Sequence, residues 1–141
     1  MHPLNCTVEA ETVNVEEVPY QLGPLTITLV DTPGFDDTTR SDAEVLQTLA
    51  QWMEKSFVAG TLLSGIIYLH RITDPRMKNT SMRNLQLFRK LCGEENLSNI
   101  VLVTNMWETI SMAEGEEKER ELVSTGEFWG GMVARGAKVR R

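Results

Sequence analysis

The chain has 141 residues, the length of one domain, and its apolar content of 41% is ordinary for a globular protein. A net charge of −6 argues against a general surface for nucleic acid or anionic membranes. The longest nearly apolar run, residues 57–69, is too short to span a bilayer, and the N-terminus lacks a signal-peptide pattern. Cys6 and Cys92 form no zinc spacing, so we expect reduced thiols. Together these features predict a cytoplasmic protein with no transmembrane segment and no nucleic-acid partner.

The first predicted elements form a hairpin. Residues 7–18 carry an alternating pattern that is typical of a strand, and the turn signal Gln-Leu-Gly-Pro follows at 21–24. A second strand is predicted over 25–30, where apolar residues alternate with threonines, which are good strand formers. Two strands on either side of a short turn predict antiparallel pairing.

The second strand stops at Asp31-Thr32-Pro33-Gly34. Pro33 cannot donate to a ladder and Gly34 has wide backbone freedom, so the chain must turn there. A carboxylate at the end of a buried strand, followed by a glycine with a free amide, suits magnesium and phosphate. Asp31 would hold Mg²⁺ through water, and the Gly34 N–H would point at a terminal phosphate. The alternative interpretation is an ordinary strand-to-turn junction, where Asp, Pro and Gly are common for local reasons.

Asp31-Thr32-Pro33-Gly34 resembles the Walker B and switch II box (Asp-x-x-Gly) of P-loop GTPases. With the following Phe-Asp-Asp-Thr at 35–38, it most resembles the septin-like and immunity-associated (GIMAP-like) branch, particularly its fungal members. The resemblance implies that Asp31, Thr32 and Gly34 contact the nucleotide. It also implies that Thr7 stands at the place of the switch I threonine and closes on Mg²⁺, although a solvated strand residue is the plainer interpretation of Thr7.

The resemblance identifies no catalytic residue. Phe35 occupies the place where many small GTPases carry a water-orienting glutamine, and a phenylalanine cannot orient water. Hydrolysis would therefore need another group, which the resemblance implies could come from across a G-domain homodimer.

The middle of the chain predicts alternating helices and strands. Ser41-Asp42-Ala43-Glu44 is a capping box, and a helix with an apolar stripe that includes Phe57 follows it as far as Gly60. A continuous apolar run over 64–69 predicts a parallel strand covered on both faces. In the loop over 70–76 an Asp–Arg pair is expected to fix the chain. The next helix begins at Asn79 or Thr80 and ends at Gly93.

A buried strand over 100–104 delivers Asn105-Met106-Trp107-Glu108 to the edge of the sheet where open α/β folds bind ligands. The resemblance implies that this is the base-reading box, usually Asn-Lys-x-Asp. Asn105 and Glu108 would then contact guanine, and Met106 replaces the lysine. Glutamate keeps the charge and both acceptors of the usual aspartate, but its extra methylene shifts the contact by about 1.5 Å.

The end of the chain predicts a charged, solvated helix face over 113–120 and apolar helical residues from 122 to 133 that pack on the sheet. A short strand begins at 137. The order of elements, read with the resemblance, predicts a partial G domain over residues 1–141. The fold class is α/β: a three-layer P-loop NTPase fold with a mostly parallel sheet and an antiparallel N-terminal hairpin. Its first strand and helix and its last helix would be absent.

The 141 residues contain no Gly-Lys pair, and therefore no Walker A loop of the form Gly-x-x-x-x-Gly-Lys-Ser/Thr. In the family's sheet the missing strand lies between those at 25–30 and 64–69, so these two must pair directly or leave backbone groups unpaired.

Two hypotheses follow. In the first, the chain is a fragment of a GTPase that binds GTP or GDP with Mg²⁺ and hydrolyses GTP slowly when intact, while this chain is impaired. In the second, it is a nucleotide-free interaction module or a truncated gene product.

Overall fold

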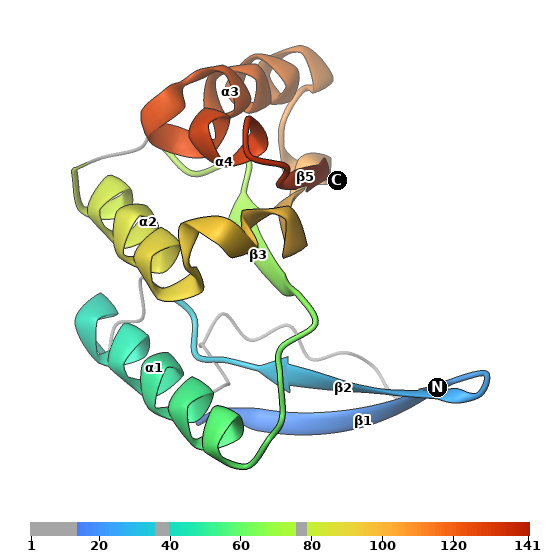
Figure 1. Ribbon diagram of the computed structural model, residues 1–141. Coiled ribbons are helices and arrows are strands. Elements are labelled where there is room, and N and C mark those ends of the chain that lie inside the picture. Colours follow the sequence, from blue (N-terminus) through green and yellow to red (C-terminus); the bar gives the residue numbers. More distant parts are fainter. Residues whose placement is uncertain (1–13, 36–39, 76–78) are drawn as a thin grey trace. The chain divides into compact units, whose positions relative to one another are not determined.

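The computed structural model describes residues 14–35, 40–75 and 79–141, and the chain divides into two compact units, Met1–Thr61 and Leu62–Arg141. The first unit contains a two-stranded hairpin and a helix, and the second contains a three-stranded sheet with its helices (Figure 1). In the part of the chain that is described, no helix is long and apolar enough to cross a membrane.

The predicted antiparallel hairpin is confirmed. Strands β1 (Glu16–Leu22) and β2 (Leu25–Asp31) pair from Glu16 opposite Asp31 to Leu22 opposite Leu25. The predicted bounds of the first strand are wrong in the described residues, because Gln21 and Leu22 belong to the strand and not to the turn. Gly23 has a φ of 58°, so two residues suffice to reverse the chain and pairing runs to Leu22. The earlier part of the predicted strand, residues 7–13, lies outside the described residues.

The hairpin has one apolar face, formed by three cross-strand pairs: Val18 with Leu29, Tyr20 with Ile27, and Leu22 with Leu25. All six side chains are exposed, so the expectation that the second strand is buried is wrong. Alternation places Glu17 on the opposite face, where its carboxylate accepts a 2.9 Å hydrogen bond from Trp52 Nε1. Within the described residues, the helix of this unit therefore contacts the polar face, and the six apolar side chains of the other face are exposed.

Helix α1 (Asp42–Val58) begins at the predicted capping box. Ser41 Oγ accepts from the Glu44 N–H at 3.3 Å, and the Glu44 carboxylate accepts from the Ser41 N–H at 2.7 Å. Val45 on its apolar stripe is buried, but Phe57 is 71% exposed, so the predicted stripe is wrong at its last turn.

The second unit is built on a parallel sheet in the order β3 (Ile66–Arg71), β4 (Ile100–Asn105), β5 (Lys138–Arg140). Helix α2 (Asn79–Cys92) and a 3₁₀ turn (Glu94–Asn99) connect β3 to β4. The predicted stop is confirmed at Gly93, whose φ is 81°. The third strand includes His70 and Arg71, which the sequence assigned to a loop.

Helix α3 (Met112–Ser124) leads from β4 towards β5 through a kinked π-type segment (Gly126–Gly130) and the short helix α4 (Gly131–Val133). Phe128 has φ −90° and ψ −122°, which breaks helical geometry and starts a new direction. The predicted packing of this region is confirmed, since Leu122, Trp129 and Met132 are buried.

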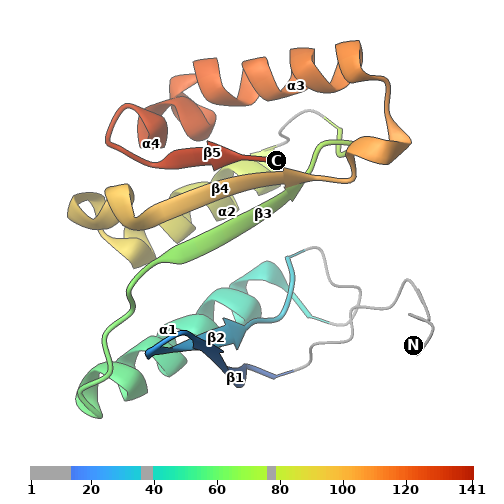
Figure 2. The same ribbon diagram turned by 90° about the vertical axis from the view of Figure 1, so that its right-hand side faces the viewer.

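The core of the second unit lies on one face of its sheet. Tyr68 on β3 packs against this core, with its ring 4.9 Å from that of Phe88 on α2, and the other buried members come from β4 and from the helices and loops around it: Leu85, Cys92, Leu97, Ile100, Leu102, Leu122, Trp129, Met132 and Ala137. On the opposite face, Ile67 and Leu69 are 62% and 63% exposed. The prediction that this strand is covered on both faces is therefore wrong, because both crossover connections lie on the same side (Figure 2).

The two sheets are separate. Among the described residues, β2 pairs with β1 alone and β3 pairs with β4 alone. Within its own unit, each of these two strands therefore has one edge without a strand partner in the described part of the chain.

Candidate functional site

The candidate residues of the first unit follow the end of β2. Asp31 is the last residue of the strand, lies opposite Glu16 in the register and is exposed. Pro33 is buried and Thr32 is partly buried, so the turn is anchored while Asp31 and Gly34 remain at the surface. The hairpin thus presents Asp31 at the carboxyl end of a strand, where the sequence predicted it.

The described residues give no structural reason for a glycine at position 34. An added Cβ would meet no described atom within 4 Å, and the φ of Gly34 lies outside the left-handed region. Neither packing nor backbone conformation therefore explains a glycine here. Close approach of a ligand to the backbone is another reason for which a sequence uses glycine, and the contact between the Gly34 amide and a phosphate stays a prediction.

The residues of the first unit fit magnesium only in part. Mg²⁺ prefers oxygen ligands, keeps several waters and commonly uses one or two carboxylates, and Asp31 offers such a carboxylate. In the described part of the chain, no group of three or more His, Cys, Asp and Glu side chains could hold a metal ion. Thr7, the other predicted ligand, lies outside the described residues, as do residues 36–38 of the motif.

The candidate residues of the second unit follow the end of β4. Asn105 is the last residue of the strand and pairs in register with Arg71, and its carbonyl accepts a 3.0 Å hydrogen bond from the Ile72 N–H. The side-chain Oδ1 of Asn105 is buried and has no hydrogen-bond partner in the described structure. A buried amide oxygen without a partner is costly, and a bound ligand that donates to it would remove that cost.

Trp107 anchors the loop that follows. Its Nε1 donates a 3.0 Å hydrogen bond to Thr104 Oγ1, and Thr104 Oγ1 donates at 3.1 Å to Glu119 on α3. The indole also lies against α3 at Gly115, where an added Cβ would stand 2.6 Å from Trp107 Cζ3. A glycine in the helix interior therefore makes room for the ring.

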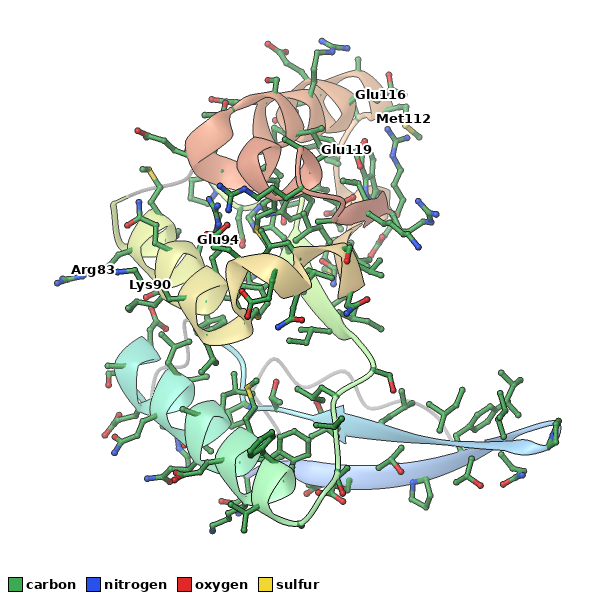
Figure 3. The ribbon with its side chains drawn as sticks, in the orientation of Figure 1. Arg83, Lys90, Glu94, Met112, Glu116 and Glu119 are labelled. Atoms are coloured by element: carbon green, nitrogen blue, oxygen red, sulfur yellow. The ribbon has the colours of Figure 1, made fainter. Side chains whose placement is uncertain are left out.

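Arg141 lies over the ring of the same tryptophan. Its guanidinium lies 4.2 Å from the centroid of the indole ring, a cation–π distance. The same guanidinium donates to Glu119 at 2.5 and 3.0 Å and lies 3.8 Å from Glu116; both glutamates are on α3 (Figure 3). The hydrogen bond to Glu119 raises the pKa of the Arg141 guanidinium above its ordinary value. Trp107 thus contacts both α3 and Arg141.

This anchor fixes the residues on either side of it. Met106 adopts a left-handed conformation with φ 64°, which is uncommon for a residue other than glycine, and its carbonyl accepts from the Thr109 N–H and hydroxyl. Glu108 lies in the 3₁₀ turn Trp107–Thr109 and is exposed. The structure therefore places Asn105 and Glu108 on one short loop held by Trp107, with the Glu108 carboxylate accessible to a donor ligand.

The neighbouring loop after β3 is closed by an ion pair. Arg71 Nε lies 3.1 Å from Asp74 Oδ1, which confirms the predicted Asp–Arg tie. A cavity of about 30 Å³ beside this loop is lined by His70, Asp74, Lys118 and Phe128, among others. It has room for about one water and cannot hold a nucleotide base.

The residues that support the loop were not found from the sequence. Thr104, Glu119 and Arg141 were assigned to a strand, a solvated helix face and a strand end, and only their contacts show what they do. The one available signal was Gly115, a helix-interior glycine among charged residues, since such a glycine usually has a packing or functional reason.

Comparison with known proteins gives similarity in structure alone. No family model matches the sequence, and no curated protein sequence matches it significantly. Among solved structures, the chain is similar to Toc33 from Arabidopsis thaliana in complex with GDP and Mg²⁺, with a TM-score of 0.69 and 14% sequence identity over 94% of this chain. It is also similar to Toc33 in complex with Mg²⁺ and GMPPNP (TM-score 0.68, 15% identity, 92% of this chain).

A third similar structure, a dimerization-deficient variant of Toc33, has a TM-score of 0.67 and 14% identity over 90% of this chain. The chain spans 55–57% of the length of these Toc33 structures. Similarity at this level of identity establishes the fold. The chain has part of the α/β fold of a P-loop GTPase domain, with a parallel three-stranded sheet and an antiparallel hairpin.

Proposed function

We propose that this chain is part of a guanine-nucleotide-binding domain of the septin-like and GIMAP-like type. In this proposal Asn105 and Glu108 bind the base, Asp31 organises Mg²⁺ through water, Thr32 contacts the nucleotide and the Gly34 amide contacts a phosphate. The intact protein hydrolyses GTP slowly. The G-domain fold, shared with a protein whose solved structures contain GDP or GMPPNP with Mg²⁺, supports the proposal.

The observation that carries it is the loop after β4. An exposed carboxylate at Glu108 can accept from two N–H groups on one edge of a base, and the nearby Asn105 keeps a buried amide oxygen without a described partner. The contacts of Trp107 with Thr104, Gly115 and Arg141 hold this loop in place before any ligand arrives, which lowers the entropic cost of binding.

A fluorescent GTP analogue tests the proposal by titration with Mg²⁺ present, with unlabelled GTP and ATP as competitors. Because this chain is expected to be impaired, we expect weak but saturable binding that GTP reverses more effectively than ATP, and still weaker binding by Glu108→Ala. Glu95→Ala is the matched control, because Glu95 is also an exposed glutamate in a 3₁₀ turn of the second unit. Equal competition by GTP and ATP in both the wild-type chain and Glu108→Ala would contradict the guanine assignment.

The second hypothesis, a nucleotide-free interaction module, is favoured by one observation. The 141 residues contain no Gly-Lys pair, so this sequence supplies neither the amide cradle nor the lysine with which P-loop proteins bind the β-phosphate. If no saturable binding of the analogue is observed, the interaction module is the better description. We also propose a G-domain homodimer, and sedimentation velocity with and without the analogue tests it.

A further inference from the structure

Glu119 on α3 contacts two residues that in turn contact Trp107. Its Oε1 accepts a 3.1 Å hydrogen bond from the Thr104 hydroxyl, whose oxygen accepts from Trp107 Nε1. Its Oε2 accepts from the Arg141 guanidinium, which lies over the indole ring. One carboxylate therefore supports the edge of the indole through Thr104 and its face through Arg141.

The position of Glu119 calls for a carboxylate. Its two partners are both donors, a hydroxyl and a guanidinium, so both side-chain oxygens must accept. Only 14% of its side chain is exposed, so water has little access to replace either partner. Glu116 also lies on α3, 3.8 Å from the same guanidinium, but 48% of its side chain is exposed, and an exposed ion pair contributes little. Removal of the Glu119 carboxylate should therefore disturb Trp107 far more than removal of the Glu116 carboxylate.

The loop that carries the candidate base contacts depends on Trp107. A group that recognises a ligand through two hydrogen bonds must be held within about 0.5 Å of the productive geometry. The Glu108 side chain is exposed, so its place is set mainly by its own backbone, which follows Trp107 directly. Met106, on the other side of Trp107 in the sequence, has a φ of 64°, so the path of the loop is unusual on both sides of the ring. A displaced indole would therefore displace the Glu108 carboxylate.

We propose that Glu119 is a positioning residue that sets the selectivity of this site for guanine. Glu119 does not contact the nucleotide in this proposal; it fixes Trp107 and, through it, Glu108. The inference rests on the proposed function, because selectivity presupposes that Asn105 and Glu108 bind the base. GTP and ATP carry the same triphosphate, so the ratio of their dissociation constants reports the contacts to the base. That ratio is meaningful even in a sequence that contains no Walker A loop.

Competition against the fluorescent GTP analogue gives the dissociation constants of GTP and ATP for the wild type and three variants. Glu119→Ala should lower the preference for GTP over ATP by about tenfold. Glu119→Gln keeps the size of the side chain but has one acceptor oxygen, so it cannot accept from both Thr104 and Arg141, and it should lower the preference by a smaller factor. Glu116→Gln is the matched control and should keep the wild-type ratio.

Amide hydrogen exchange measures the position of the loop without any ligand. The Thr109 N–H donates to the Met106 carbonyl within the loop. This amide should exchange about tenfold faster in Glu119→Ala than in the wild type, and at the wild-type rate in Glu116→Gln. Far-UV circular dichroism should show all three variants folded, and Glu119→Gln keeps the test intact if Glu119→Ala does not fold. Unchanged exchange at Thr109 in both Glu119 variants would overturn the inference.

The binding results separate this inference from the proposed function. If the wild type prefers GTP and both Glu119 variants keep its ratio, the inference is wrong and the proposed function stands. If the Glu119 variants lose affinity for GTP and ATP by the same factor, the role of Glu119 is structural and the inference is also wrong. A wild-type chain without saturable binding would overturn the proposed function and this inference together.

Discussion

Trp107 Nε1 donates a 3.0 Å hydrogen bond to Thr104 Oγ1, which joins the candidate base-binding loop to the interior of β4. Thr104 is buried, and its hydroxyl also donates to Glu119, so one side chain satisfies a donor on the loop and an acceptor on α3. The loop is therefore fixed by a side-chain hydrogen bond to β4 as well as by the hydrogen bonds within its own turn.

Thr104→Val should destabilise the second unit. Valine keeps the shape of threonine but removes the hydroxyl, which leaves the Trp107 N–H and one Glu119 oxygen without this partner. A loss of about 1–3 kcal/mol is expected for a partly buried group left unsatisfied. Urea unfolding followed by tryptophan fluorescence measures it. Thr61→Val is the control, because Thr61 is exposed, and an equal change in both variants would contradict the role of the Thr104 hydroxyl.

Local sequence signals predicted much of the fold. The capping box at Ser41 and Glu44, the hairpin and the stop at Gly93 each depend on a few neighbouring residues, so their structure can be derived without knowledge of the rest of the chain. The strand Ile100–Asn105 was also predicted, to within one residue of its end, because a continuous apolar run followed by polar residues indicates where it stops.

Burial and the support of the site could not be derived in the same way. The alternating pattern around Ile27 and the apolar run that contains Leu69 both indicate strands, but whether a face is covered depends on the handedness of distant connections. The support of Trp107 joins Thr104, Glu119 and Arg141, which lie up to 37 positions apart in the sequence. No local period or spacing marks such a set.

Gly115→Ala tests the fit of Trp107 against α3. Alanine favours a helix interior by about 1 kcal/mol over glycine, but here its Cβ would stand 2.6 Å from the indole, and overpacking costs typically about 1–3 kcal/mol. We therefore expect net destabilisation and an altered near-UV circular dichroism spectrum. Gly126→Ala is the control, because its added Cβ meets no described atom within 4 Å. A stabilised Gly115→Ala variant with an unchanged spectrum would show that the ring is not confined.

Glu44→Gln should weaken the start of α1 and lower the melting temperature of the chain, and the size of this decrease should depend on pH. Hydrogen bonds from the Ser41 backbone N–H and then the Ser41 hydroxyl lower the pKa of Glu44 below its ordinary value of 4.5. The stabilisation is therefore complete above pH 4.5 and is lost as the pH falls through the lower pKa of the folded state. Thermal unfolding followed by circular dichroism at 222 nm should give a higher melting temperature for the wild type than for Glu44→Gln at pH 7. Near pH 3 the two melting temperatures should be equal. Glu54→Gln, an exposed position on the same helix, should show no such convergence.

His70 should make the second unit less stable in mild acid. Burial lowers the pKa of His70, although Asp74 acts to raise it and Arg71 and Lys118 act to lower it further; its ring also lies 5.7 Å from that of Trp129. Since the pKa in the folded state lies below the unfolded value near 6.5, the stabilisation is complete above pH 6.5 and is lost as the pH falls through the folded pKa. The urea concentration at which half of the wild-type chain is unfolded should decrease as the pH is lowered from 7.5 to 5.5. In His70→Gln this decrease should be smaller, while His2→Gln, outside the described residues, should behave as the wild type. Parallel pH profiles of the wild type and His70→Gln would show that His70 remains as easily protonated in the folded chain as in the unfolded one.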